Sequence, residues 1–466
     1  MIAALDRVTP PPVALGLAAL LASILAALVV AKLPVSKSVL LATALVILLI
    51  GLLHIKLTIY MIIFSMLLSP ELGVGVVAGD RPVTIRFEDI LLILVGVAWV
   101  VRAVYRKNAG LFRDSPLNRP ILAYSATAVL ATLANGWSHD INWLRALLFL
   151  AKYLEYFVLY FLVLNNLRGR NDIRNYLIAA FVTCAVVSVM CISQIPGGGR
   201  VTAPFEGEDS EPNTLGGYLV FMLALASGFY FTASTRRERV LWLSFAALAT
   251  LPLLYTLSRS SWLAGSIVAV MLLWRIPRKG QLLAAGAMAV ALSPLFLPEQ
   301  VVHRLEYTFG QPPEPGQIQV GRTRLDTSLS ARIRSWQYGL SGWTQKPLIG
   351  HGVAGYGFMD AQYVRVLTET GLLGFAAFVW LAISIWRMAR HRLHHAKDRF
   401  ASALSLGYLA GFSALLVHGI GANTFIIVRI MEPFWLVTAL VVALQQNEST
   451  TTIQEREAAP RGLDRA

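Results

Sequence analysis

One long polar interval, from Glu299 to about Gly374, separates two apolar runs and carries residue types suited to binding an anion. Its cations and aromatic side chains include Arg304, Arg322, Arg324, Arg332, Arg334, Lys346, Arg365, Trp336, Trp343, Tyr356 and Tyr363. Arginine presents a planar fork of N–H donors that matches phosphate oxygens. Function often resides in segments that a rigid scaffold holds outside the lipid. We therefore expect the functional site in this interval.

A further arginine, Arg259, lies in the short turn Tyr255-Thr-Leu-Ser-Arg-Ser-Ser-Trp262 between two apolar runs. An arginine near the membrane core costs about 2.5–3.5 kcal/mol by insertion scales and less near the surface. We interpret Arg259 as a phosphate-binding residue that faces an outward cavity. The alternative is a side chain that reaches the lipid headgroups from a tight hairpin.

The segment from Ser330 to Trp343 has the apolar spacing of an amphipathic helix lying on the outer leaflet. Its apolar positions are Ile333, Trp336, Leu340 and Trp343. Arg332 and Arg334 flank this stripe at the water boundary. The two cations could meet a lipid diphosphate, or they could bind ordinary anionic headgroups.

A glycine-rich stretch follows this helix, with glycines at 350, 352, 355 and 357. Such a loop allows close backbone approach and can present N–H groups to an anion, which makes Gly350 and Gly352 candidate contacts. No Gly-Lys-Ser/Thr follows, so the stretch is not a Walker A loop. The signal of an isolated glycine-rich loop is weak.

Three residues are candidates for a general base. Asp360 and Glu369 bracket the start of the next apolar run, and either could take a proton from a sugar hydroxyl if burial raised its pKa. Their structural alternatives are a helix cap for Asp360 and a solvated first-turn acid for Glu369. His351 in the glycine-rich stretch is the third candidate.

The segment from Arg200 to Tyr218 is polar and precedes another apolar run, where Asn213 or Thr214 could cap a helix. It also holds a group of acids: Glu206, Glu208, Asp209 and Glu211. These acids could hold a divalent ion, but a solvated acidic loop is favoured because no ligand spacing stands out.

Composition identifies an integral membrane protein: the 466 residues are 56% hydrophobic and 14% charged, against about 25% charged in soluble domains. The net charge of +14 resides mostly in short loops beside apolar runs, which argues against nucleic acid and favours an anionic lipid-linked or phosphorylated substrate. Cys184 and Cys191 lie in one apolar run and indicate neither a disulfide nor a metal site.

The apolar runs predict fourteen transmembrane helices, with twelve or thirteen possible because His54 and Lys56 make only a slim break. The first run is too long for a signal-peptide core and lacks a cleavage site, so we expect it to be retained. The predicted spans are 13–31, 38–53, 55–70, 88–104, 119–134, 143–165, 174–193, 214–233, 240–257, 260–274, 281–298, 367–386, 400–420 and 425–445.

These spans imply an all-α chain in four parts: helices within 1–298, a large outer loop at 299–366 that contains amphipathic helices, further helices within 367–445, and a disordered tail at 446–466. Every basic cluster in the loops follows an even-numbered span, for example Arg168 to Arg174 and Arg387 to Arg399. The positive-inside rule therefore predicts cytoplasmic termini and an outward-facing large loop.

Three short-range patterns within the spans suggest structural roles. We expect Lys152 to pair with Glu155, and Arg429 with Glu432, because each pair lies three residues apart on one helix face. The Gly407-x-x-x-Gly411 pattern is typical of close helix packing.

Four of these segments, in this order, resemble the motifs of the O-antigen ligase and O-antigen polymerase superfamily between Arg200 and Gly374. Phe205 through Pro212-Asn213 to Leu215-Gly216 resembles the family's Gly-x-Phe…Pro-Asn-x-Leu-Gly segment, with Pro204 in place of the glycine. The other three matches are Thr256-Leu-Ser-Arg259, then Arg332-Ile-Arg-Ser-Trp336 with Pro347-Leu-Ile-Gly350-His-Gly352, and Glu369-Thr-Gly371-Leu-Leu-Gly374.

The resemblance implies a type-C glycosyltransferase architecture in the bacterial inner membrane, with the active site facing the periplasm. It also implies glycan transfer from an undecaprenyl diphosphate-linked oligosaccharide, without metal or nucleotide-sugar donor, to an acceptor glycan or lipid A core. Arg259 and Arg332 match the arginines that hold the diphosphate. With Asp360 and His351 they form our candidate catalytic set. The candidate substrate-binding residues are Arg200, Asn213, Arg334, Trp336, Gly350, Gly352, Tyr363, Arg365 and Glu369.

One departure separates two activities. Ligases of this family carry a His-Asn pair before the Glu-x-Gly motif, whereas this chain has Asp360-Ala-Gln-Tyr363. We therefore favour a polysaccharide polymerase, with a ligase as the alternative if His351 replaces the missing histidine. A non-enzymatic transporter of lipid-linked sugars is a third and weaker hypothesis, because it would need ionisable residues in many spans.

Overall fold

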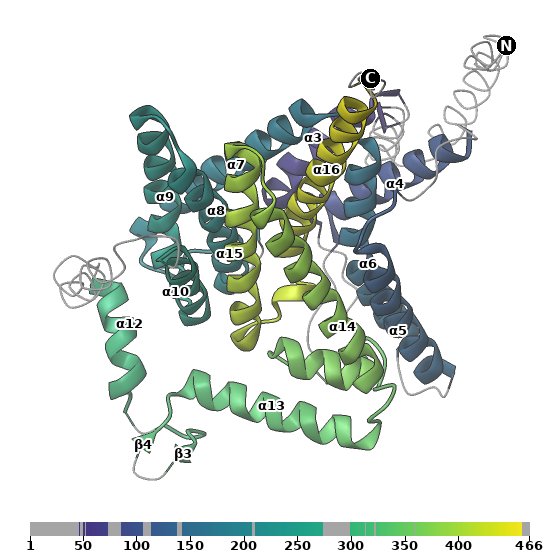
Figure 1. The fold of residues 1–466 in the computed structure, drawn as a ribbon. Helices are drawn as coiled ribbons and strands as arrows, with labels where there is room; N and C mark the ends of the chain where they lie inside the picture. Colours follow the sequence, from purple (N-terminus) through teal and green to yellow (C-terminus); the bar gives the residue numbers. More distant parts are fainter. Residues whose placement is uncertain are drawn as a thin grey trace, which may run out of the picture.

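The computed structural model describes residues 46, 50, 51, 53–72, 85–105, 113–137, 142–206, 210–273, 299–312, 314–320, 323–357 and 359–458. The predicted spans at 13–31 and 281–298, and most of the span at 38–53, lie outside these residues. The described part is an all-α bundle with two small antiparallel strand pairs (Figure 1).

The remaining predicted spans each coincide with a helix. The helices are α3 (Ile55–Leu68), α4 (Phe87–Tyr105), α5 (Asn118–Trp137), α6 (Trp143–Asn166), α7 (Arg170–Ile192), α8 (Pro212–Thr232), α9 (Arg236–Tyr255), α10 (Arg259–Leu273), α12 (Glu299–Gly310), α13 (Thr327–Gln345), α14 (Gln362–His394), α15 (Arg399–Gly421) and α16 (Val428–Ala458). The strand pairs are β1 (Glu71–Leu72) with β2 (Ile85–Arg86), and β3 (Gln319–Val320) with β4 (Thr323–Arg324).

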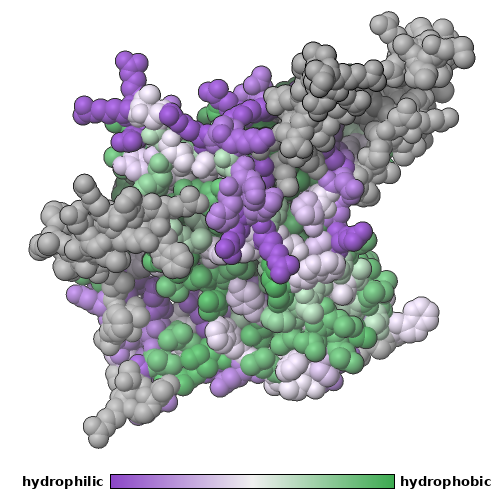
Figure 2. Space-filling view, in the orientation of Figure 1, coloured by the Kyte–Doolittle hydropathy of each residue, from purple (hydrophilic) through white to green (hydrophobic). Residues whose placement is uncertain are grey.

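Six of the described helices are long and apolar enough to cross a membrane, which confirms a multi-pass membrane protein. Their ranges are Trp143–Asn166, Arg170–Gly197, Pro212–Thr232, Arg236–Tyr255, Gln362–His394 and Arg399–Gly421. Figure 2 shows hydrophobic side chains over the flank of the bundle and hydrophilic ones gathered toward the top of the view. That distribution suits helices that present apolar surface to lipid.

Helices α8 and α15 form the tightest part of the bundle, and glycines permit their close approach. A Cβ atom at Gly407 would lie 2.6 Å from the Leu225 Cα, and one at Gly411 would lie 2.7 Å from the Phe221 ring. Gly228 faces α15 in the same way, 2.3 Å from the Ala403 carbonyl oxygen. The predicted role of the Gly407-x-x-x-Gly411 pattern in close packing is confirmed.

Both predicted short-range ion pairs are wrong, because tertiary partners lie closer. Lys152 Nζ donates to Asp89 Oδ2 on α4 at 2.8 Å, rather than to Glu155. The Arg429 guanidinium donates to the backbone carbonyls of Pro204 and Ser69 at 3.0 Å. It also lies 3.5 Å from a carboxylate oxygen of Glu206. Glu206 is therefore a buried partner of α16 rather than part of a solvated acidic loop.

The C-terminal segment also differs from its prediction. Helix α16 continues to Ala458, so residues 446–458 are helical rather than disordered. These residues follow an apolar helix without an intervening proline or glycine, and their Gln and Glu residues are good helix formers. Residues 459–466 lie outside the described part.

Helix α14 contains a break that the sequence pattern marks with a glycine. Gly371 has φ +66° and ψ −168°, a backbone conformation that side-chain-bearing residues rarely adopt. The break lets residues 362–370 run beside α13 before the helix turns into the bundle (Figure 1). Helix α13 itself lies across one end of the bundle, and α12 stands beside it (Figure 1).

We expect Gly371→Ala to destabilise the protein. A Cβ atom there would lie 2.3 Å from the Leu348 carbonyl group, and the backbone conformation alone costs about 1–3 kcal/mol for a residue with a side chain. Thermal unfolding of the detergent-solubilised protein measures the effect. The control is Gly197→Ala, because a Cβ atom at Gly197 meets nothing within 4 Å. Equal unfolding temperatures for the two variants would contradict this interpretation.

Candidate active site

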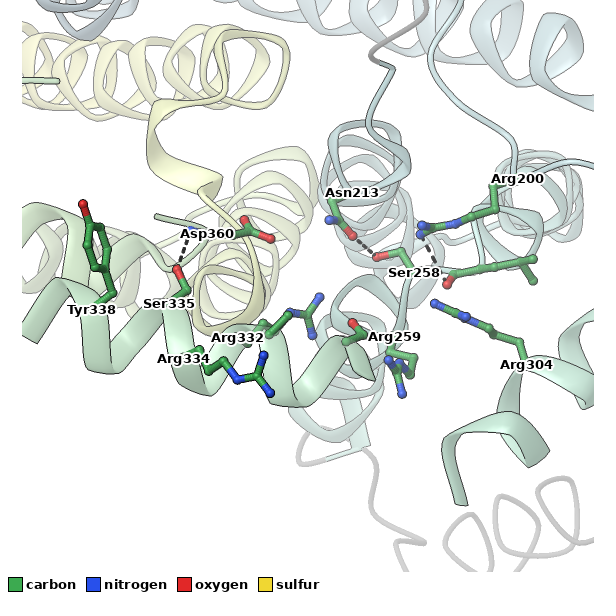
Figure 3. Close-up of a pocket in the computed structure, with 13 residues that line it drawn as sticks. Arg200, Asn213, Ser258, Arg259, Arg304, Arg332, Arg334, Ser335, Tyr338 and Asp360 are labelled. Atoms are coloured by element: carbon green, nitrogen blue, oxygen red, sulfur yellow. Dashed lines mark hydrogen bonds between the residues drawn. The ribbon is translucent and has the colours of Figure 1, made fainter. Parts of the chain in front are cut away.

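A cavity of about 560 Å³ opens where α13 crosses the end of the bundle. Its wall is formed by side chains from the loop before α8, the start of α8, the α9–α10 turn, α12, α13 and the segment before α14. The lining residues are Arg200, Asn213, Leu257, Ser258, Arg259, Arg304, Ser328, Ala331, Arg332, Arg334, Ser335, Tyr338 and Asp360. Five arginines and one aspartate face this space, which we call the arginine cavity (Figure 3). Its chemistry is that of an anion-binding site.

Arg259 joins the bundle to the start of α13. Its two terminal nitrogens donate to the two carboxylate oxygens of Asp326, at 2.9 and 2.8 Å. Asp326 is the N-cap of α13, and one of these oxygens also accepts from the backbone N–H groups of Ser328 and Leu329. A bidentate arginine–carboxylate pair fixes direction as well as distance. The pair therefore sets where α13 begins and how it points.

The turn that carries Arg259 is strained and held from several sides. Leu257 has φ +51°, which is uncommon for a residue with a branched side chain. Arg200 Nε donates to the Thr256 carbonyl oxygen at 2.9 Å, and Nη2 donates to the Leu257 carbonyl oxygen at 3.4 Å. The Ser258 hydroxyl donates to Asn213 Oδ1 on α8 at 2.6 Å. Asn213 therefore orients this turn from inside α8 and is not the helix cap that we predicted.

Further hydrogen bonds connect the same turn to α15. The hydroxyl groups of Ser258 and Ser261 lie 2.7 Å apart, and the Ser261 hydroxyl lies 3.0 Å from His418 Nε2. His418 Nδ1 in turn lies 2.7 Å from the Thr424 hydroxyl. Because these partners are buried, the turn has a fixed position in the bundle.

Helix α13 brings Arg332 and Arg334 to the cavity. Small residues on its inner face allow close contact with α14: a Cβ atom at Gly339 would lie 2.5 Å from the Val364 side chain. The backbone N–H of Asp360 donates to the Ser335 hydroxyl at 3.0 Å, which places Asp360 beside the same cavity. Figure 3 shows Arg332 and Arg334 on one side of the cavity and the other arginines opposite.

The arginines lie close enough to affect one another's protonation. Burial, with repulsion from neighbouring arginines, lowers the pKa of Arg200 to about 10. Burial also lowers the pKa of Arg332, an effect that repulsion by Arg259 adds to and attraction by Asp360 opposes. The pKa of Arg304 is likewise lowered by burial and by Arg259. A bound anion would relieve this repulsion, because all of these groups are still cationic at neutral pH.

His351 lies away from the arginine cavity. The residue is 9% exposed, its Nε2 lies 2.9 Å from the Gly342 carbonyl oxygen, and its ring packs against Tyr356. Its backbone N–H donates to the Thr368 carbonyl oxygen at 2.9 Å. The structure therefore uses His351 to join the loop to α13 and does not bring it to Arg332.

Gly350 and Gly352 serve the same loop, which we call the glycine loop (residues 347–357). Both have positive φ angles, +75° and +83°, that favour glycine. The Gly350 carbonyl oxygen accepts from Asn135 Nδ2 on α5 at 3.0 Å, and the Gly352 N–H donates to the Glu369 carbonyl oxygen at 2.8 Å. Neither glycine lines the arginine cavity. Their backbone groups instead form hydrogen bonds with α5 and α14.

Glu369 and Arg365 form a buried centre beneath this loop. One Glu369 carboxylate oxygen accepts from Arg365 Nε at 2.9 Å and from the Ala354 N–H at 3.1 Å. The other accepts from the Tyr153 hydroxyl on α6 at 2.6 Å. Glu369 is 2% exposed, so the prediction of a solvated first-turn acid is wrong. The pair joins the loop, α14 and α6.

The last two predicted substrate contacts also lie outside the cavity lining. The Tyr363 hydroxyl donates to the Leu416 carbonyl oxygen on α15. Trp336 lies on the outer face of α13 and is 37% exposed, one turn before Leu340, which is 42% exposed. The predicted helix from Ser330 to Trp343 is confirmed as part of α13. Of its apolar stripe, Trp336 and Leu340 are exposed, whereas Ile333 and Trp343 are half-buried.

The predicted residues thus divide into two groups. The cavity gathers Arg200, Asn213, Arg259, Arg332, Arg334 and Asp360. The sequence interpretation missed Arg304 as a cavity residue and Asp326 as the partner of Arg259. Asp326 had a usable signal, because an aspartate before a helical pattern is an N-cap signature. Within the described residues, no group of three or more His, Cys, Asp or Glu could hold a metal ion.

A model of the family described as O-antigen ligase matches residues 243–379, less than a third of the chain. The matched residues include the α9–α10 turn, α12, α13, the glycine loop and the first half of α14. The match therefore covers most of the arginine cavity. It supports the O-antigen ligase and polymerase superfamily, whose members are glycosyltransferases. No curated protein matches the chain.

The Arg259–Asp326 pair predicts a pH-dependent stability. Burial alone would raise the pKa of Asp326, but hydrogen bonds from Arg259 and two N–H groups lower it below its ordinary value. This stabilisation is present above about pH 4, the ordinary value for aspartate, and is lost as the pH falls through the lowered pKa of the folded state. The thermal unfolding temperature should therefore fall more steeply below pH 4 in the wild type than in Asp326→Asn.

At neutral pH we expect Asp326→Asn itself to reduce stability by about 1–3 kcal/mol, because Arg259 loses its charged partner. The control is Glu314→Gln, which changes an exposed carboxylate in the same region. If the difference in unfolding temperature between wild type and Asp326→Asn stayed constant from pH 7 to pH 3, the ion pair would not stabilise the fold.

Proposed function

We propose that the protein transfers glycan from an undecaprenyl diphosphate-linked donor to a sugar hydroxyl, and that it is a polysaccharide polymerase. The observation that carries this proposal is the gathering of five arginines around one cavity at the end of a membrane bundle. A lipid-linked diphosphate has a strongly anionic group where its hydrocarbon tail meets water. The arginine cavity provides positive charge at the end of the membrane bundle, where the diphosphate of such a lipid would lie.

The proposed chemistry is a displacement at the anomeric carbon of the donor sugar. The acceptor hydroxyl oxygen forms a bond to that carbon, the bond from carbon to the diphosphate oxygen breaks, and the bonding electrons leave with the undecaprenyl diphosphate. Negative charge on the leaving oxygen increases during this step. Arg332 and its neighbours would stabilise that charge because they are already in place before the reaction.

The acceptor's hydroxyl proton needs a base, and Asp360 is our candidate. It is the only carboxylate among the cavity-lining residues, and its backbone is fixed by the hydrogen bond to Ser335 on α13. A carboxylate beside Arg332 would accept the proton while the diphosphate leaves on the other side of the sugar. Glu369 is less suitable because three donors already occupy its carboxylate.

The position of His351 favours polymerase over ligase. The family's ligases have a histidine near the Glu-x-Gly motif, and the replacement that we considered, His351, is bonded to the Gly342 carbonyl group away from the cavity. The ligase alternative keeps its support in the description of the matched family as O-antigen ligase. In that case lipid A core would be the acceptor.

We propose that the cavity faces the periplasm from the bacterial inner membrane and that both termini are cytoplasmic. Two predicted cytoplasmic loops meet at one end of the bundle, where Arg170 pairs with Asp398. That end is opposite α13 (Figure 1). Positive loops at one end and the cavity at the other agree with the positive-inside rule.

We expect Arg332→Ala to reduce glycan transfer at least about 100-fold, as removal of one donor to a developing anion does in other enzymes. The assay uses purified protein, undecaprenyl diphosphate-linked oligosaccharide and no added metal, with products followed by gel and mass spectrometry. Arg237→Ala is the matched control. It removes an exposed arginine at the N-terminal end of α9, whereas the cavity lies at the C-terminal end of that helix. Near-normal transfer by a folded Arg332→Ala protein would disprove the proposed role.

The same assay separates the candidate activities. A ladder of longer lipid-linked glycans without added acceptor would establish a polymerase. Transfer only in the presence of lipid A core would establish a ligase. Movement of intact donor across a vesicle membrane without either product would mean that the cavity binds a transported substrate.

A further inference from the structure

A second cavity, of about 500 Å³, adjoins the arginine cavity. Its lining residues are Gly198, Arg200, Leu257, Glu299, Gln300, His303, Arg304 and Tyr307. Three of them, Arg200, Leu257 and Arg304, line both cavities. A ligand in the second cavity would therefore contact the same two arginines as an anion in the first.

One face of α12 supplies most of this second wall. Gln300, His303, Arg304 and Tyr307 recur at three- and four-residue intervals, which places them along one side of the helix. The rings of His303 and Tyr307 have centroids 6.4 Å apart and planes only 22° apart. The Arg304 guanidinium lies 6.0 Å from the centre of the Tyr307 ring. The face therefore presents two nearly parallel rings side by side.

These groups have the chemistry of a carbohydrate site. Flat rings with polar tips can contact the C–H face of a sugar and still reach its hydroxyl groups. Among the lining residues, Glu299 offers acceptor oxygens and Gln300 offers both donors and an acceptor. The arginines lie only on the wall shared with the first cavity, so this cavity has less positive charge than the first.

We propose that the second cavity binds a sugar of the glycan and holds it against the reacting diphosphate. This inference rests on the proposed function, because it assumes that the arginine cavity binds the diphosphate. The sugar could belong to the acceptor or to the donor, since both present the same pyranose chemistry. In either case α12 is the element that selects the glycan.

Binding of carbohydrate alone tests the proposal. The probe is the oligosaccharide released from the lipid-linked donor by mild acid, with binding followed by saturation-transfer NMR on the purified protein. We expect wild type to bind it, and Tyr307→Ala and Gln300→Ala to weaken binding at least tenfold. Tyr307→Phe should keep most of the affinity because it keeps the ring. Glu306→Ala changes an exposed residue of α12 outside the cavity lining and should bind normally.

A second probe, undecaprenyl diphosphate without glycan, separates this proposal from the proposed function. Tyr307→Ala should bind that lipid normally and Arg332→Ala should not, whereas Arg332→Ala should still bind the free oligosaccharide. If Arg332→Ala kept its affinity for both undecaprenyl diphosphate and the oligosaccharide, the result would count against the diphosphate site and not against the carbohydrate site. Unchanged oligosaccharide binding in both Tyr307→Ala and Gln300→Ala, or none in wild type, would overturn the carbohydrate site.

Competition identifies the source of the sugar. If oligosaccharide binding persists when the protein is saturated with lipid-linked donor, the cavity is an acceptor site. If the donor displaces the oligosaccharide while undecaprenyl diphosphate alone does not, the cavity holds the donor glycan. Both results support a carbohydrate site, and they assign it to different partners.

Discussion

The ion pair between Arg259 and Asp326 is the interaction on which the candidate site depends. It joins a turn fixed inside the bundle to the N-cap residue of α13, and both carboxylate oxygens take part. The middle of α13 packs against α14, where the Thr368 hydroxyl donates to the Gly339 carbonyl oxygen at 2.8 Å, and the ion pair fixes the start of the helix. Because Arg332 and Arg334 lie about two turns beyond Asp326, the pair helps to set the position of these two arginines in the cavity wall. An arginine–carboxylate pair suits this task because its two parallel hydrogen bonds resist rotation.

The far end of α13 is fixed by a different kind of contact. Glu369 gathers Arg365, Tyr153 and the glycine-loop backbone into one buried network, and Lys346 donates to Asn135 Oδ1 on α5 at 2.7 Å. A fully bonded polar centre of this kind holds its elements in one arrangement. The cavity arginines repel one another, and the rigid supports at both ends of α13 oppose that repulsion. The cavity can therefore stay positively charged before any substrate arrives.

Much of the fold was predictable because membrane helices depend on local composition. Apolar runs located the spans within the described residues, and the Gly407-x-x-x-Gly411 pattern indicated close packing. Long-range partners were not predictable in the same way. Lys152 bonds Asp89 rather than Glu155, and Arg429 bonds backbone carbonyls of two distant loops. Spacing along one helix cannot show which neighbouring helix brings a closer partner.

The candidate site shows the same division. Residue type, local position and the motif resemblance suggested Arg259, Arg332 and Asp360 as site residues. The same reasoning misplaced His351 and Glu369, because a histidine or glutamate can also join buried elements. What decides between these roles is whether other groups already occupy the side chain, as the Gly342 carbonyl oxygen does for His351. That information exists only once α13, the glycine loop and the bundle are assembled.

The most direct test of the account compares the affinity of the purified protein for undecaprenyl diphosphate and for undecaprenyl monophosphate. The two lipids have the same tail and differ by one phosphate, so native mass spectrometry can measure both without any glycan present. If several arginines grip the diphosphate together, it should bind at least tenfold more tightly, about 1.4 kcal/mol. Equal affinities would contradict the account, because they would mean that the cavity recognises only the tail or a single charge.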